Sequence, residues 1–234
     1  MKILINTPKL DKLGGVSNHY LGLKKYWKNN VVYNQTGGRF YIPGFFLLPF
    51  DIIFFILKLL MFRPELVVLN PSLNQKAYFR DSVFLKVSKL LQFKVVVFFH
   101  GWDKQFEQKI TKKSFINRYG VSDSIIILAE EFKNKIRHWG YKNPLFLTTT
   151  KVDDKLLEGY HYNPINDKLK IIFFSRITHN KGIYMAMDVF TELQKSYTKS
   201  TLDIVGDGPE LKNAINYASN KEIKNIVFHG QING

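Results

Sequence analysis

Cysteine is absent from the 234 residues of this chain, which excludes a disulfide scaffold, thiolate zinc sites and a cysteine nucleophile. Six histidines occur without an HxxxH spacing or a neighbouring cluster of carboxylates, so the sequence predicts no metal site. The amino-terminal segment lacks the apolar core of about 7–15 residues that a signal peptide needs. What is present, 45% apolar and 23% charged residues, is ordinary for a globular protein.

Acidic residues are few, and the net charge is unevenly distributed along the chain. Lys and Arg number 34 against 19 Asp and Glu, a net charge of +15. Residues 1–150 hold 23 cations and 9 anions, a net +14, whereas residues 151–234 hold 11 and 10, a net +1. The first half therefore suits an anionic partner, such as an anionic lipid, a phosphorylated substrate or nucleic acid, or it has a solvated lysine-rich surface. Aromatic-basic RNA motifs and helix-turn-helix spacing are missing, so nucleic acid is not expected.

The longest apolar run spans residues 42–62 and is interrupted by Pro43, Pro49, Asp51 and Lys58. A charge near the centre of a membrane span costs about 2.5–3.5 kcal/mol. The run therefore predicts a loop followed by a buried or membrane-lying helix from about Asp51, rather than a span.

Apolar runs typical of strands alternate with helical patterns along the chain. Such alternation predicts βαβ units and parallel sheets. We expect α/β architecture with two doubly wound, Rossmann-like domains: residues 1–160, and residues 161–234 after a polar linker over 160–168. The second series is short, so we expect it to be cut off within the domain. Strands are predicted over residues 2–6, 66–70, 94–100, 124–128, 145–149, 169–174, 201–205 and 226–229, and helices over 17–27 (capped by Ser17), 81–91, 130–139, 183–196 and 209–218.

Ligands of open parallel sheets lie at the carboxyl ends of the strands, where three groups of residues stand out. Gly14 and Gly15 open a helix and let backbone N–H groups approach a phosphate or sugar, or they form a simple flexible turn. His100 ends the strongest strand; it can change charge near neutral pH and donate a hydrogen bond, or it is a rim histidine bonded to backbone. Arg176 and Lys181, five residues apart in one loop, suit a diphosphate.

Other candidates have simpler structural explanations. The segment Asp207-Gly208-Pro209-Glu210 forms a turn with Pro209 at the first helical position. The remaining histidines that we considered, His19, His138, His161 and His229, have no comparable setting, so we expect structural roles for them.

Five motifs occur in this order: GGVSNHY, HGWD, FFSRITHNKGIYMAMDVF, LDIVGDGPELKNAI and IVFHG. Together they resemble the family-4 (group 1) glycosyltransferases of the GT-B fold. The resemblance implies sugar transfer from a nucleoside diphosphate sugar with retained anomeric configuration and without a metal or other cofactor. It further implies that Arg176 and Lys181 bind the donor diphosphate, that Gly14 and Gly15 shape the loop beside it, and that His100 approaches the transferred sugar as a catalytic residue.

The sequence departs from the family pattern in two places. The Glu-x7-Glu segment of the family would lie beyond residue 234, and the usual Asn-Gly-Val-Asp is replaced by residues 150–153, TKVD. We expect a hexosyltransferase of cell-surface glycan synthesis, located in the cytoplasm or peripherally at the inner face of the membrane. Its acceptor would be a polysaccharide or lipid-linked and would lie on the domain of residues 1–160. The alternatives are an inactive fragment or accessory subunit of a split enzyme, and a nucleotide-sugar epimerase.

Overall fold

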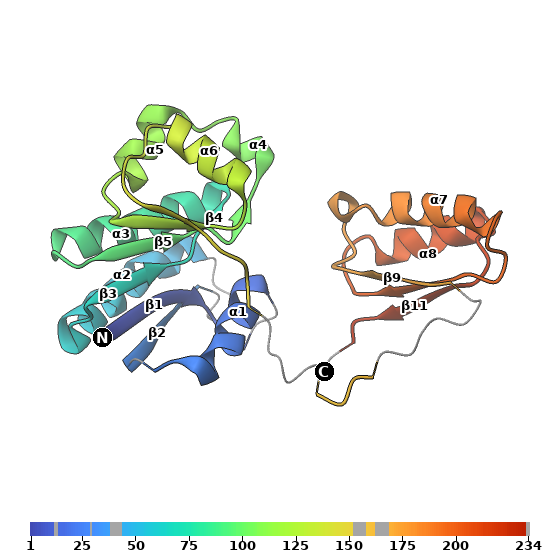
Figure 1. Cartoon of the computed structure of the whole chain (residues 1–234), viewed down its shortest axis with the longest axis horizontal. Coiled ribbons are helices and arrows are strands. Elements are labelled where there is room, and N and C mark those ends of the chain that lie inside the picture. Colours follow the sequence, from blue (N-terminus) through green and yellow to red (C-terminus); the bar gives the residue numbers. More distant parts are fainter. Residues whose placement is uncertain (12–13, 29, 38–43, 152–157, 162–168, 233–234) are drawn as a thin grey trace. The chain divides into compact units, whose positions relative to one another are not determined.

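The computed structural model describes residues 1–234 except 12–13, 29, 38–43, 152–157, 162–168 and 233–234, and the backbone alone at 44–46. The chain divides into two compact units, Met1–Glu158 and Gly159–Gly234 (Figure 1). Most of the predicted linker over residues 160–168, and residues 152 and 153 of the TKVD segment, lie outside the described residues.

The first unit contains a six-stranded sheet in which all strands are parallel. Its order is β2-β1-β3-β5-β7-β8, so the direction of winding reverses at β1. A reversal of this kind opens a crevice at the carboxyl ends of the two strands that flank it, here β1 and β3. The strands are β1 (Lys2–Pro8), β2 (Asn30–Thr36), β3 (Leu66–Leu69), β5 (Val95–Phe98), β7 (Ser124–Ile127) and β8 (Leu145–Leu147), with a separate short pair, β4 (Ser72–Leu73) and β6 (Gly101–Trp102).

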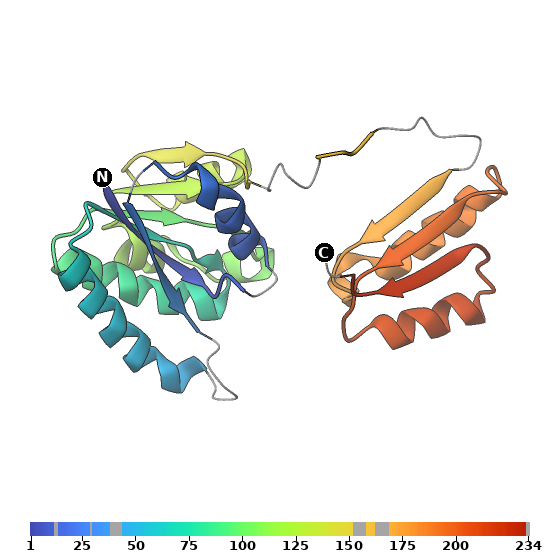
Figure 2. The ribbon, with the colours of Figure 1, turned by 90° about the horizontal axis from the view of Figure 1, so that it is seen from below.

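The helices of the first unit cover the two faces of its sheet unequally. Figure 2 shows α1 (Gly15–Leu23) on the opposite face from α2 (Gly44–Phe62). The main core joins the inward side chains of the strands, such as Leu4, Val67 and Val97, to Phe55 and other residues of the helices on the α2 face. A smaller cluster lies under α1 and the short helix η1 (Lys24–Tyr26). The remaining helices are α3 (Gln75–Leu90), α4 (Lys104–Glu107), α5 (Lys112–Tyr119) and α6 (Glu130–His138).

The second unit contains three parallel strands in the order β9-β10-β11, with η3 (His179–Lys181) after the first. Both of its helices, α7 (Ile183–Gln194) and α8 (Leu211–Asn220), pack on one face (Figure 1). The other face exposes Ile172, Phe174 and Val227, and it carries a hydrogen bond of 2.6 Å between Nε2 of His229 and Oδ1 of Asp203. The strands are β9 (Lys170–Phe174), β10 (Thr201–Val205) and β11 (Ile226–Gly230).

The structure confirms that strands form in all eight segments where the sequence predicts them. The continuous apolar run of β5 indicates a buried strand of a parallel sheet. In the structure Val95, Val97 and Phe98 are buried and Val96 is partly buried. The strand β2 was not predicted, because its residues Asn34, Gln35 and Thr36 are polar and it lies at the edge of the sheet.

The prediction that a helix begins near Asp51 is wrong, because α2 begins at Gly44 and includes Pro49. Proline removes only one helical hydrogen bond, whereas Leu48 and Ile52 on either side pack against the core and stabilise the helix. Among the helices that the structure describes, none has the length and apolarity that crossing a bilayer requires.

Three other helix starts also differ from the prediction. Ser17 lies inside α1, where its hydroxyl donates to the carbonyl of Lys9 over 3.0 Å, so it does not cap the helix. The helix α8 begins at Leu211, because Pro209 belongs to the preceding turn. The helix α3 begins at Gln75, since Asn74 caps it by accepting from the N–H of Ala77 over 3.0 Å.

Candidate functional site

Arg176 and Lys181 lie in the segment between β9 and α7, at the carboxyl end of the strand. Ile177 between them is completely buried and anchors the segment, because its N–H donates to the carbonyl of Asp207 over 2.9 Å. The N–H of Lys181 donates to the carbonyl of Thr178 over 3.0 Å, which closes a turn of η3. The two cationic side chains therefore extend from a rigid backbone.

This segment packs closely on the loop that follows β10. A Cβ atom at Gly206 would collide with the carbonyl oxygen of Ser175, and one at Gly208 with that of Ile177. Both glycines have positive φ angles, 144° and 159°, that other residues rarely adopt. The glycines of LDIVGDGP therefore allow the loops after β9 and β10 to touch, which the sequence alone did not show.

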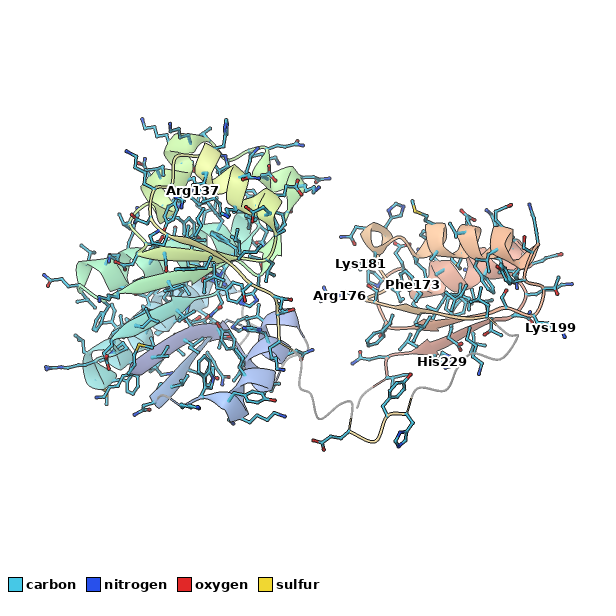
Figure 3. All side chains as sticks on the ribbon, in the orientation of Figure 1. Arg137, Phe173, Arg176, Lys181, Lys199 and His229 are labelled. Atoms are coloured by element: carbon cyan, nitrogen blue, oxygen red, sulfur yellow. The ribbon has the colours of Figure 1, made fainter. Side chains whose placement is uncertain are left out.

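The cationic groups of this segment are available to a ligand. Arg176 and Lys181 are both exposed, and within the part of the chain that the structure describes neither has an ion-pair partner. Figure 3 shows both at one end of this unit, with Lys199 at the opposite end. Within the described residues no side chain caps the amino terminus of α7, so its first N–H groups have no capping partner there.

The neighbouring acidic groups are already occupied by hydrogen bonds. Asp207 accepts from the N–H of Gly208 over 2.6 Å, and Glu210 accepts from the hydroxyl of Tyr184 over 2.5 Å. The bond from Tyr184, followed by one from Asn213, lowers the pKa of Glu210. In the described part of the chain neither carboxylate forms an ion pair with Arg176 or Lys181, so both cations face solvent.

In the first unit, His100 belongs to a buried hydrogen-bond network at the carboxyl ends of β1 and β3. The side-chain amide of Asn70 donates from Nδ2 to the carbonyl of Asn6 over 2.8 Å, which fixes its Oδ1 as an acceptor. That oxygen accepts from the hydroxyl of Tyr20 over 2.6 Å and lies 3.0 Å from Nε2 of His100. We therefore assign the hydrogen of the His100 ring to Nε2.

The charge of His100 differs from the expectation. Burial, and secondarily the neighbouring His19, lower the pKa of His100 to about 3, so the ring is neutral at physiological pH. Its Nδ1 atom is a buried acceptor, and no hydrogen-bond donor reaches it within the described structure. The lowered pKa does not favour the expected change of charge near neutral pH, and in this arrangement the Nε2 hydrogen is directed at Asn70.

His19 belongs to the same site, although the sequence predicted only a structural role for it. Its ring centroid lies 5.2 Å from that of His100, and its Nδ1 atom accepts from the backbone N–H of Lys151 over 2.8 Å. Burial lowers the pKa of His19. The one sequence signal for His19 is its place in the GGVSNHY motif, four residues after Gly15.

Gly14 and Gly15 form the start of α1, the helix that carries His19 and Tyr20. Gly14 is the N-cap, and its carbonyl accepts from the N–H of Asn18 over 2.9 Å. Among the described residues outside the immediate chain neighbours, no atom lies within 4 Å of the position that a Cβ atom at either glycine would take. The structure thus places Gly14, Gly15 and His100 on the first unit, and Arg176 and Lys181 on the second.

A cavity of about 570 Å³ lies against the α1 face of the first sheet. Strand side chains form its floor, residues of α1 together with Trp27 form its first wall, and residues 146–151 form its second wall. Its polar groups include His19, Tyr20 and the threonines of the second wall, while Trp27 and Phe98 contribute aromatic rings. Among the described residues, no group of three or more His, Asp or Glu side chains could hold a metal ion.

Part of the chain matches a known family, and the fold is similar to that of several solved structures. Residues 161–234 match the family model described as Glycosyl transferases group 1. No curated protein matches the chain. Among solved structures, the UDP-GlcNAc 2-epimerase from Methanocaldococcus jannaschii has 16% identity and a TM-score of 0.60, over 100% of this chain and 74% of that one.

Two further solved structures are also similar. The lipopolysaccharide outer core galactosyltransferase WaaB has 12% identity and a TM-score of 0.51, over 99% of this chain and 68% of WaaB. TarM of S. aureus has 15% identity and a TM-score of 0.50, over 71% of this chain, which spans only 32% of TarM. The chain therefore has a GT-B fold, and its second unit carries the sequence pattern of the group 1 glycosyl transferases.

Proposed function

We propose that this chain takes part in retaining glycosyl transfer from a nucleoside diphosphate sugar to a hydroxyl of a polysaccharide or lipid-linked acceptor. The reaction would belong to cell-surface glycan synthesis in the cytoplasm or at the inner face of the membrane. The match of residues 161–234 to group 1 glycosyl transferases supports the transfer of a sugar, and the names of the structural neighbours support a nucleotide-sugar substrate.

One observation carries the proposal. Arg176 and Lys181 are exposed and, in the described part of the chain, have no ion-pair partners; the two-glycine contact of Gly206 and Gly208 fixes the loop that holds them. A guanidinium offers a planar pair of donors and an ammonium a mobile charge, which together suit the two phosphates of a diphosphate.

The same cations can lower the reaction barrier. The diphosphate gains negative charge as its bond to the anomeric carbon breaks. Arg176 and Lys181 would therefore bind the transition state more strongly than the ground state. No metal or cofactor enters this proposal, because the two side chains and the open N–H groups of α7 supply the positive potential.

The first unit would receive the sugar and the acceptor. No described residue crowds Gly14 and Gly15 at the start of α1, and the neighbouring cavity offers aromatic rings and hydroxyl groups, which suit a sugar ring. His100 would act as a neutral imidazole that, through Asn70 and Tyr20, holds the side chains at this end of the site in place. It would not act as a cation.

Calorimetric titration of the full chain with UDP, GDP, ADP and CMP tests the donor site. We expect one diphosphate to bind selectively and the Arg176→Ala/Lys181→Ala variant to bind it at least about tenfold more weakly, since a charged hydrogen bond contributes about 1.5–3 kcal/mol. Lys199→Ala is the matched control, because Lys199 is an exposed cation at the opposite end of the same unit (Figure 3). Equal binding by the double variant would refute the assignment of the diphosphate to this loop.

An epimerase is the second candidate, because a UDP-GlcNAc 2-epimerase aligns over the whole chain with a TM-score of 0.60. NMR analysis of UDP-GlcNAc incubated with the protein and no acceptor separates the two reactions. Formation of the 2-epimer would establish the epimerase, whereas sugar transfer that requires an added acceptor would establish the transferase.

The chain could also act as one subunit of a split transferase. In that case the isolated chain would bind a diphosphate but would transfer sugar only after addition of a second polypeptide. Assaying the chain alone and with cell extract, after donor binding has been measured, distinguishes this arrangement from an independently active enzyme.

A further inference from the structure

We propose that the exposed side of α2 is a membrane-docking surface that binds bilayers containing anionic lipid. The surface, here called the α2 stripe, consists of Phe50, Ile53, Leu57 and Met61. These four apolar residues are 60%, 54%, 47% and 84% exposed. The proposal goes beyond glycosyl transfer and does not depend on it.

The spacing of these residues makes the stripe continuous. They follow one another at intervals of three, four and four residues, so they line one side of a helix with 3.6 residues per turn. Exposed Phe54 and Leu60 border the same side. Contiguous exposed apolar surface of this kind marks an interaction site, whereas single exposed apolar residues do not.

The opposite side of α2 is packed in the protein interior, so only the exposed side of the helix can contact a membrane. Phe55 and Leu59 are completely buried in the main core, and the ring of Phe55 lies 5.0 Å from that of Phe84. Asp51 is 4% exposed and accepts from the N–H of Gly37 over 3.1 Å. A helix tied to the domain in this way can lie in the interface but cannot cross the bilayer.

Cations border the stripe, which favours a lipid surface over a neutral apolar partner. Lys2 extends to the carboxyl end of α2, where its Nζ atom lies 5.6 Å from the centroid of the Phe62 ring. Arg63 follows the helix and is exposed, whereas Lys58 is half-buried and its Nζ atom donates to the carbonyl of Tyr33 over 3.1 Å. Near this end the exposed acid is Glu65, which already accepts from the N–H of Lys2 over 2.9 Å. Apolar side chains flanked by Lys and Arg are typical of helices that lie on anionic membranes.

The amino end of α2 lies at the same edge of the sheet as the network of Asn70 and His100. A helix that connects two parallel strands runs antiparallel to them, so the amino end of α2 lies at the edge where β1 and β3 end (Figure 2).

Co-sedimentation with phosphatidylcholine vesicles, with and without phosphatidylglycerol, tests the proposal in the absence of donor and acceptor. We expect binding to the anionic vesicles that weakens with salt, and at least tenfold weaker binding by Ile53→Gln/Leu57→Gln. Met185→Gln/Val189→Gln is the matched control, because both residues are exposed apolar positions, four apart, on α7 of the other unit. This control should bind within twofold of the wild type. Circular dichroism of each variant establishes that it is folded.

Three results would overturn the proposal. The first is absence of wild-type binding to either kind of vesicle, and the second is equal loss of binding in the α2 and α7 variants. The third is self-association that Ile53→Gln/Leu57→Gln abolishes while vesicle binding persists, since the stripe would then join two copies of the chain. Donor binding, measured separately, would be unaffected by any of these results, so failure of this proposal is distinguishable from failure of the proposed transferase function.

Discussion

The Nε2 atom of His100 lies 3.0 Å from the Oδ1 atom of Asn70. Because the amide nitrogen of Asn70 donates to the carbonyl of Asn6, its oxygen can only accept, and the ring nitrogen must carry the hydrogen. The hydroxyl of Tyr20 donates to the same oxygen. Asn70 thus determines both the tautomer and the orientation of the histidine at the carboxyl end of β5.

Replacing Asn70 with Asp should raise the pKa of His100, because a carboxylate beside the ring favours the imidazolium form. In the wild type the ring should remain neutral, with the hydrogen on Nε2, down to about pH 5, since the pKa is lowered to about 3. Long-range nitrogen–proton NMR of the protein with labelled histidine measures both the tautomer and the titration.

Asn143→Asp is the matched control for this experiment. Asn143 belongs to the same unit and donates to the carbonyl of Ser122, away from the histidines. This substitution should leave the titration of His100 unchanged. A wild-type His100 that titrates near the ordinary value of about 6.5 would contradict the assigned network.

The first unit should lose stability as the pH falls below about 6.5. Between that value and about 3 the unfolded chain binds a proton at His100 that the folded protein does not, so the free energy of unfolding decreases with acidification. The slope for one group is at most about 1.4 kcal/mol per pH unit. Urea unfolding followed by tryptophan fluorescence measures it, since Trp27, Trp102 and Trp139 all lie in this unit.

His100→Gln should reduce the dependence of the free energy of unfolding on pH between pH 6.5 and 5. Most carboxylates titrate below this range. His161→Gln removes one imidazole from the other unit and should leave the tryptophan-detected slope unchanged. Identical slopes for the wild type and His100→Gln would mean that the ring of His100 is protonated in the folded state.

The sequence predicted those features that depend on neighbouring residues. The run VVVFFH indicates a buried strand, and SRITHNKG indicates a cationic loop between a strand and a helix. The convergence of Tyr20, Asn70 and His100 was not predictable, because it depends on the order of β1, β3 and β5 in the sheet. Long-range order of this kind has no local signature. The role of His19 was missed for the same reason, since its partner Lys151 is 132 residues away.

Gly206→Ala should destabilise the second unit by about 1–3 kcal/mol, because the added Cβ collides with the carbonyl oxygen of Ser175. The loops after β9 and β10 must then separate, so we expect the affinity for a nucleoside diphosphate to fall at least about tenfold although Arg176 and Lys181 are unchanged. Hydrogen exchange of the two loops, together with calorimetry, measures both effects.

Gly230→Ala is the control that has the cost of a positive φ angle but lacks the collision with a carbonyl oxygen that Gly206→Ala causes. Gly230 has a φ of 67°, but a Cβ there would meet no atom within 4 Å. This variant should be destabilised by about 1–2 kcal/mol and should keep its affinity. If both alanine variants lose affinity equally, the contact between the loops does not organise the anion site.

The two sides of α2 should respond differently to substitution. Phe55→Ala removes a completely buried ring and should lower the free energy of unfolding of the first unit by about 3–5 kcal/mol. Ile53→Ala, two residues earlier on the exposed side, should change it by no more than about 0.5 kcal/mol while weakening vesicle binding. Tryptophan-detected urea unfolding and vesicle co-sedimentation measure the two responses on the same samples. A large loss of stability in Ile53→Ala would mean that this side of the helix is packed in solution, and the apolar residues of the α2 stripe would then serve the fold rather than a membrane.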